Sequence, residues 1–114
     1  MDLTKKKCVP CEGGIPKLSG ADIEKYRKSI MDDWKVEDNK KLTKRFLFVN
    51  FRHTMDFVNR VAELAEEEGH HPIMHVSYSD MVIEIYTHAI NGLSENDFIL
   101  AAKIDTIKIN NPTY

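Results

Sequence analysis

Apolar residues repeat at helical spacing most clearly in residues 53–68, where one face of a helix would be apolar and the other charged. Gly69 suits the left-handed position that commonly follows a helix, and Pro72 prevents an early return to helix. The pattern therefore predicts a helix over residues 53–68. Its apolar positions are Met55, Val58, Val61, Ala62 and Ala65.

Two more helices are indicated by start signals. Ser19 is a candidate N-cap with Asp22 three residues later, and apolar residues follow at helical spacing, which predicts a helix that stops near residues 32–33. Ser94 and Asp97 repeat the same capping pattern. They predict a third helix that runs to about Lys108.

Four segments have the two-residue alternation of strands. Residues 34–37 form a short one, and residues 42–51 form a longer one with apolar side chains on both faces, which indicates a central strand. Residues 73–78 and 81–88 read as a hairpin around Ser79 and Asp80. This hairpin would give the sheet its third and fourth strands.

The register of the hairpin depends on the length of its loop. A two-residue loop pairs Tyr78 with Met81 and Val76 with Ile83, and the same rule carried further sets His71 opposite His88. It also places three residues of each strand on one apolar face: Met74, Val76 and Tyr78 with Met81, Ile83 and Ile85.

The order α-β-β-α-β-β-α predicts an α+β fold, a four-stranded and mainly antiparallel sheet with three helices on one face. Residues 1–18 read as an irregular arm, residues 19–108 as a single domain and residues 109–114 as a frayed tail. Such a sheet leaves a face or an edge available, so we expect a homo-oligomer.

Composition narrows the function. The net charge of −2 lacks the basic footprint of a nucleic-acid-binding protein, and the longest apolar run, Phe46–Val49, is far too short to span a bilayer. No apolar segment follows the lysines of residues 1–7, so we expect a cytoplasmic protein. Cys8 and Cys11 should then be reduced thiols without a catalytic role.

Three of the five histidines are the candidate chemistry: His70 and His71 at one helix end, and His88 on the hairpin. Imidazoles beside a carboxylate suit proton transfer, and Glu66 lies one helical turn before His70, close enough to orient a ring. A metal site remains an alternative, although two adjacent histidines converge poorly on one ion. Taken singly, these residues also have purely structural explanations. His71 can be a cation at a helix end, Glu66 belongs to a solvent-exposed run of glutamates, and Asp97 is the capping partner of Ser94. His53 and His75 are expected to be surface or structural residues.

One ordered motif resembles pterin-4a-carbinolamine dehydratase. It consists of Glu66-x-x-x-His70-His71-Pro72, Val76-x-Tyr78, Thr87-His88 and Gly92-Leu93-Ser94-Glu95-x-Asp97, followed by Leu100-Ala101. The resemblance covers residues 17–108, and the segment around Cys8 and Cys11 is similar to the lead of bacterial-type members. Some members have tryptophan where this chain has Met74, so we expect an altered pocket wall.

The resemblance implies a small α+β subunit that forms dimers or tetramers and needs no metal or organic cofactor. It implies dehydration of 4a-hydroxytetrahydropterin to quinonoid dihydropterin, in tetrahydrobiopterin recycling. By position it implies His70, His71 and His88 as catalytic residues, and Glu66, Tyr86, Thr87, Ala89 and Asp97 as substrate-binding residues.

The chemistry of the histidines agrees with this activity, because the substrate must lose hydroxide from C4a and a proton from N5. Our hypothesis gives His71 and His88 the acid and base roles and gives His70 mainly pterin binding. Two other functions stay open. One is a non-catalytic dimerisation or transcriptional cofactor on the same fold, and the other is a metal-dependent hydrolase built on the same histidines.

Overall fold

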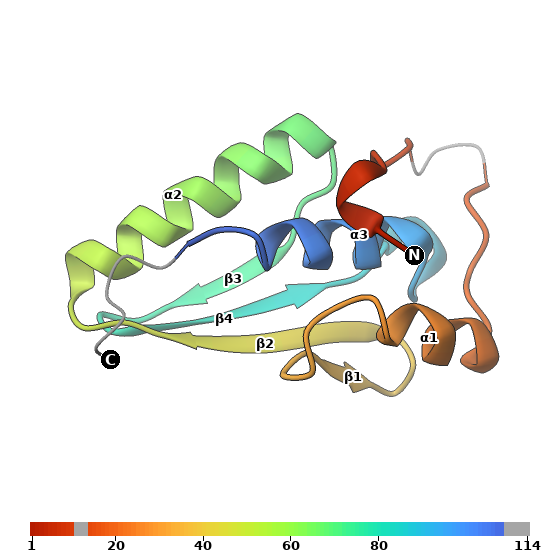
Figure 1. Ribbon diagram of the computed structural model, residues 1–114, viewed down its shortest axis with the longest axis horizontal. Coiled ribbons are helices and arrows are strands. Elements are labelled where there is room, and N and C mark those ends of the chain that lie inside the picture. The colour runs from red at the N-terminus through yellow and green to blue at the C-terminus, as the bar shows by residue number, and fades with distance from the viewer. Residues whose placement is uncertain (11–13, 109–114) are drawn as a thin grey trace.

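The computed structural model describes residues 1–10 and 14–108. Three helices pack on one face of a four-stranded sheet (Figure 1), as the sequence predicts. The predicted frayed tail lies outside the described residues, and so does Cys11. No helix in the described part of the chain is long and apolar enough to cross a membrane. In chain order the helices and strands are α1 (Gly20–Arg27), β1 (Lys35–Glu37), β2 (Lys41–Leu47), α2 (Phe51–Glu68), β3 (Ile73–Val76), β4 (Asp80–Ile85) and α3 (Glu95–Ile104), with short 3-10 helices η1 (Leu3–Lys5) and η2 (His88–Ile90).

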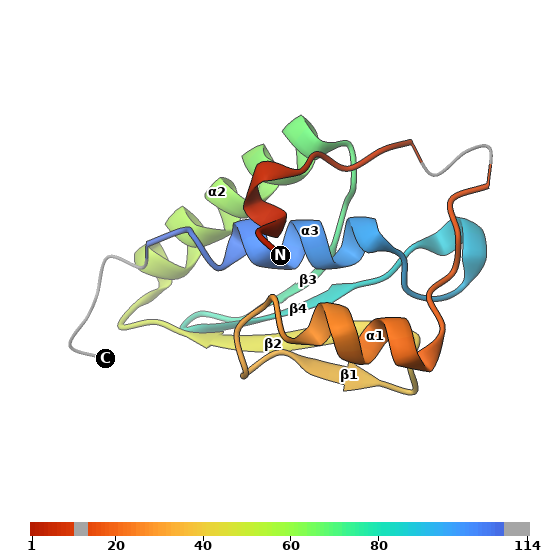
Figure 2. The same cartoon turned by 45° about the vertical axis from the view of Figure 1, so that its right-hand side comes forward.

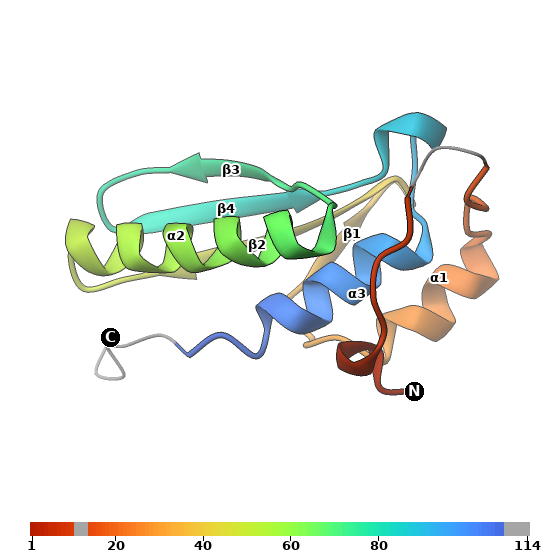
Figure 3. The ribbon, with the colours of Figure 1, turned by 90° about the horizontal axis from the view of Figure 1, so that it is seen from above.

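The sheet has the order β1-β2-β4-β3, and every neighbouring pair is antiparallel. The prediction that the second strand is central is therefore confirmed. Met81, Ile83 and Ile85 alternate along β4 and are buried against the helices, which lie together on one side of the sheet when it is seen from above (Figure 3). The core lies between this face and α1, α2 and α3, while the opposite face carries charged side chains together with the exposed apolar residues Leu47 and Ile73.

The predicted helix starts and stops depend on local hydrogen bonds. The backbone N–H of Asp22 donates to the Ser19 hydroxyl at 3.2 Å, and Ser94 and Asp97 form a complete capping box. Gly69 ends α2 with a φ of 66°, the left-handed conformation that glycine adopts without a steric penalty. These three local predictions are confirmed.

Several element ends differ from the sequence prediction, and three of these differences are the largest. The first helix ends at Arg27 instead of near residue 32, because the Arg27 guanidinium donates to the carbonyl groups of Met31 and Asp32 and holds the chain in a turn. The strand predicted over 42–51 ends at Leu47, since the Asn50 side chain accepts from the His53 backbone N–H and starts α2 at Phe51. The third helix ends at Ile104, short of Lys108.

The predicted hairpin register is wrong by two residues. Val76 pairs with Met81 and Met74 with Ile83, so the loop includes Ser77 and Tyr78, and Tyr78 is 74% exposed. A shift by an even number keeps each strand face, which is why Met74 still packs toward the core. The extended pairing of His71 with His88 is lost. The Thr54 hydroxyl donates to the Tyr78 carbonyl at 2.9 Å and holds the loop on α2.

The predicted irregular arm is folded onto the helices (Figure 2). Leu3 is buried in the core, and the Cys8 backbone N–H donates to Glu68 Oε1 at 2.9 Å. The Lys103 ammonium donates to Glu68 Oε2 at 2.7 Å. Burial alone would raise the pKa of the Glu68 carboxyl, but the hydrogen bonds from Lys103 and Cys8 outweigh it and hold that pKa below its usual value of 4.5.

Replacing Glu68 with glutamine should make the free energy of unfolding depend less on pH in the acidic range. A pKa lowered by folding stabilises the protein above pH 4.5, and this contribution is lost as the pH falls through the lowered value. We expect Glu68→Gln to reduce the free energy of unfolding by about 2 kcal/mol at pH 7, and to cost progressively less below pH 4.5. Urea unfolding across this range measures both effects, with the exposed neighbour variant Glu67→Gln as control. A cost that stays constant down to pH 3 would contradict the assignment.

Candidate functional site

The junction between α2 and β3 carries the adjacent histidines. Because Gly69 ends the helix in a left-handed turn, the two residues after it leave the helix axis and their side chains diverge. His70 is 5% exposed, whereas the side chain of His71 is 62% exposed. The two rings therefore project to different sides and have different surroundings.

His70 points into a buried polar network. Its Nε2 lies 2.6 Å from Asp97 Oδ1, while Asp97 Oδ2 accepts from the Thr87 hydroxyl at 2.9 Å and from the Ser94 backbone N–H at 2.8 Å. The Thr87 and Ser94 hydroxyls lie 2.8 Å apart. Since an ionised carboxylate only accepts, Nε2 carries the proton and donates it, which fixes the tautomer and the orientation of the ring.

Asp97 therefore has two roles in one side chain. It completes the capping box of α3, as the sequence pattern indicates, and it also binds the His70 ring. The sequence contains no sign of the second role beyond the match of Asp97 to an acidic site position of the family that the chain resembles. With 0% of its surface exposed and both oxygens occupied, Asp97 acts on its neighbours. It holds His70 and the turn between Thr87 and Ser94 together.

His71 and Glu66 form a pair on the outer surface. His71 Nε2 lies 2.5 Å from Glu66 Oε2, and both side chains are exposed. We predicted that Glu66 lies close enough to orient an imidazole. Because His70 turns inward, the imidazole that Glu66 contacts is that of His71. A carboxylate that bonds one ring nitrogen fixes the direction in which the other nitrogen faces. Glu66 can therefore orient an exposed imidazole.

The third histidine begins η2, so the strand predicted over 81–88 is too long. That strand ends at Ile85, because the backbone of Thr87 pairs with Gly92 across a turn instead of continuing the sheet. The His88 ring packs on Tyr86, with ring centroids 4.3 Å apart and planes at 47°. Between them Thr87 is fully buried and pairs with Gly92 across the turn, while Ala89 is exposed. The alternation along the strand end thus directs Thr87 toward Asp97, and leaves His88 and Ala89 on the surface.

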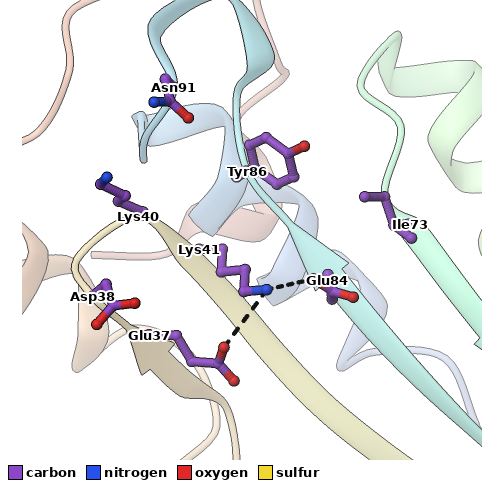
Figure 4. Close-up of a pocket in the computed structure, with 8 residues that line it drawn as sticks. All are labelled: Glu37, Asp38, Lys40, Lys41, Ile73, Glu84, Tyr86 and Asn91. Carbon is purple, nitrogen blue, oxygen red and sulfur yellow. Dashed lines mark hydrogen bonds and ion pairs between the residues drawn. The ribbon is translucent and has the colours of Figure 1, made fainter.

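A pocket of about 250 Å³ opens beside Tyr86, where β1, β2 and β4 meet (Figure 4). The Lys41 ammonium lies between two carboxylates, 2.7 Å from Glu84 and 3.7 Å from Glu37. The hydrogen bond from Lys41, aided by His75, holds the pKa of Glu84 below its usual value. Sequence reasoning missed this pocket, because its residues meet only through the pairing of β1 with β2, β2 with β4 and β3 with β4. Its walls are Glu37, Asp38, Lys40, Lys41, Ile73, Glu84, Tyr86 and Asn91.

The predicted site residues thus fall into two groups. A buried group joins His70, Thr87 and Asp97, and a surface group consists of the Glu66–His71 pair, the Tyr86–His88 stack and Ala89. Within residues 1–10 and 14–108, no group of three or more histidine, cysteine, aspartate or glutamate side chains is placed to hold a metal ion. The groups available for chemistry are therefore one anchored imidazole, that of His70, and two accessible ones, those of His71 and His88.

Comparison with known sequences gives one consistent result. Residues 16–107 match the family model described as Pterin 4 alpha carbinolamine dehydratase. A protein of Rickettsia canadensis, provisionally named pterin-4-alpha-carbinolamine dehydratase, is 47% identical over 91% of this chain and 95% of its own. A protein of Nitrosomonas europaea with the same provisional name is 49% identical over 93% of each chain.

Solved structures of similar fold have more varied names. A transcriptional coactivator/pterin dehydratase from Brucella melitensis superposes with a TM-score of 0.73 and 26% identity, covering 79% of this chain and 96% of that one. A pterin dehydratase-like protein identified as a RuBisCO assembly factor in the alpha-carboxysome has a TM-score of 0.56 and 27% identity, covering 64% and 86%. The α+β fold predicted from sequence is that of these proteins.

Proposed function

The chain belongs to the pterin 4 alpha carbinolamine dehydratase family, and on that premise we propose that it dehydrates 4a-hydroxytetrahydropterin to quinonoid dihydropterin. The observation that carries the proposal is the arrangement of the three motif histidines. One ring is locked on a buried carboxylate, while the other two are accessible on the surface. One anchored ring and two accessible rings suit a reaction in which one side chain holds the substrate and two others transfer protons.

The reaction requires a proton transfer at each of two substrate atoms: the oxygen on C4a gains a proton, and N5 loses one. The C4a–O bond breaks and the oxygen leaves as water after it receives a proton, while N5 loses its proton and forms the double bond to C4a. One imidazolium of the pair His71 and His88 supplies the first proton, and the other imidazole, neutral, accepts the second. General acid–base assistance of this kind accelerates a step by about 10²- to 10⁴-fold.

The remaining motif residues position the substrate and the rings. His70 binds the pterin with its ring held by Asp97, and Glu66 orients His71. The Thr87 hydroxyl is committed to Asp97, so substrate contact at Thr87 uses its backbone, beside Tyr86 and Ala89. The pocket next to Tyr86 gives the substrate room beside the Tyr86–His88 stack. The proposed reaction uses no metal or organic cofactor.

We also propose a cytoplasmic homo-oligomer, a dimer or a tetramer, that takes part in tetrahydrobiopterin recycling. The outer strand β3 supports self-association, because its edge position and the exposed apolar side chains of Ile73 and Val76 favour pairing with another chain.

Stopped-flow absorbance decay of chemically generated 4a-hydroxytetrahydropterin tests the function. We expect the protein to accelerate the decay at least tenfold over buffer, and the same acceleration in the presence of EDTA. Acceleration that EDTA abolishes would favour a metal-dependent enzyme in which the same histidines bind the metal ion. A folded protein without any acceleration would contradict the dehydratase. It would favour a binding module, the kind of role that the names of the coactivator and the assembly factor above give to those proteins.

A further inference from the structure

The N-terminal arm, residues 3–9, reaches the two elements that carry His70 and Asp97. Leu3 is 1% exposed within the core, and the following residues run beside α3 toward the end of α2 (Figures 2 and 3). An exposed ion pair between Lys6 and Glu95, 2.7 Å long, fastens the middle of the arm to the start of α3. The arm is thus part of the fold on the side of the candidate site.

On the α2 side, the arm bonds a buried carboxylate next to the histidines. Glu68 is the last residue of α2 and lies two residues before His70. One of its oxygens accepts from the Cys8 backbone N–H and the other from the Lys103 ammonium of α3. Because both oxygens of a buried side chain are bonded, Glu68 has little freedom, and the helix end is fixed with it.

On the α3 side, the next residue of the arm bonds a buried amide beside Asp97. The Asn96 amide nitrogen donates to the Val9 carbonyl at 2.7 Å, and its oxygen accepts from the Val9 backbone N–H at 3.0 Å. This two-way pairing resembles one step of a strand ladder. The Cys8 thiol is buried and lies 3.5 Å from the Asn96 carbonyl, so the backbone of Cys8 and Val9 bridges the end of α2 and the start of α3.

From these contacts we infer that Glu68 and Asn96 are positioning residues for the His70–Asp97 hydrogen bond, and that Cys8 and Val9 link them. The arm sets the separation of the α2 end from the α3 start, and the 2.6 Å bond between His70 and Asp97 spans that same separation. The effect on catalysis rests on the proposed dehydratase function. The effect on the ring of His70 does not, so the two can be tested apart.

The test uses the full chain with Cys11→Ser, which leaves Cys8 as its one cysteine. Burial, followed by the charge of Glu68, raises the pKa of the Cys8 thiol to about 12, so alkylation by iodoacetamide is slow while the arm is docked. In Asn96→Ala we expect alkylation at least tenfold faster. We also expect the proton resonance of His70 Nε2–H to broaden or disappear, and kcat for the pterin substrate to fall at least tenfold.

Two further variants keep the test decisive. Lys6→Ala breaks the exposed ion pair of the same arm, and should change neither the alkylation rate, the resonance nor kcat by more than twofold. Glu68→Gln retains an oxygen for the Cys8 N–H but loses the charge that holds Lys103. It should show the same three effects as Asn96→Ala in weaker form, and it replaces that variant if Asn96→Ala does not fold.

The inference is overturned if alkylation of Cys8 accelerates while the His70 resonance stays sharp, because the arm would then stabilise the fold without positioning the ring. A protein that lacks dehydratase activity altogether would instead refute the proposed function, and the resonance would still report on the arm.

Discussion

Replacing Asp97 with asparagine should reduce the free energy of unfolding by about 3 kcal/mol, the order of magnitude for losing a hydrogen bond to a buried carboxylate and leaving a buried polar group unpaired. Asp97 accepts three hydrogen bonds, from His70 Nε2, the Thr87 hydroxyl and the Ser94 N–H. An asparagine of the same shape has one oxygen, and its NH₂ would face another donor, which leaves a buried group unpaired. Thermal unfolding should show a loss of roughly 12 °C.

The same substitution should lower kcat for the pterin substrate at least tenfold, because His70 would lose the acceptor that fixes its tautomer. Glu95→Gln is the matched control. It neutralises a carboxylate in the first turn of the same helix, but that carboxylate lies in a half-exposed pair with Lys6 and should contribute less than about 1 kcal/mol. Equal losses in both variants would show that a charge at the helix start, rather than the buried network, is responsible.

Local signals made the helices predictable. An N-cap side chain bonds a backbone N–H only two or three residues away, so Ser19 and Ser94 mark their helix starts in any tertiary context, and Gly69 marks a helix end because its conformation is costly for other residues. The positions of the strands along the chain followed from the alternation of apolar and polar residues, which is also a local signal. Together these were enough for the α+β architecture.

The hairpin register was not predictable, because distant residues determine it. Ser79 accepts from the backbone N–H of Phe48, and the Tyr78 carbonyl accepts from Thr54, so the loop is held by β2 and α2. A two-residue loop would have been the usual choice for the isolated hairpin. The error mattered for the site: it set His71 opposite His88, whereas His71 pairs with Glu66 and His88 packs on Tyr86.

The candidate site was predictable in its membership and only partly in its geometry. The divergence of His70 and His71 follows from their adjacency. The partner of His70, by contrast, is 27 residues away, and the partners of Cys8 are 60 and 88 residues away. The sequence therefore gives no sign that the backbone of Cys8 and Val9 is bonded by buried side chains of α2 and α3.

Replacing either accessible histidine with alanine should remove most of the catalysis without unfolding the protein. We expect His71→Ala and His88→Ala each to lower kcat by at least tenfold, and up to about 10³-fold, since each removes one proton carrier from a reaction that needs two. The fold should persist, because the His71–Glu66 pair is exposed and such pairs contribute roughly 0–1 kcal/mol. Single-turnover stopped flow measures the rate, and circular dichroism the fold.

His75→Ala is the matched control, because His75 is also an exposed histidine bonded to a glutamate, Glu84, but lies on β3 outside the motif. It should retain the parent rate within about twofold, whereas the double variant His71→Ala/His88→Ala should be no faster than the slower single variant. If all three single variants keep full activity, proton transfer does not pass through the surface histidines. If His75→Ala is as slow as the other two, the effect comes from surface charge at this end of the sheet, and the roles assigned to His71 and His88 are wrong.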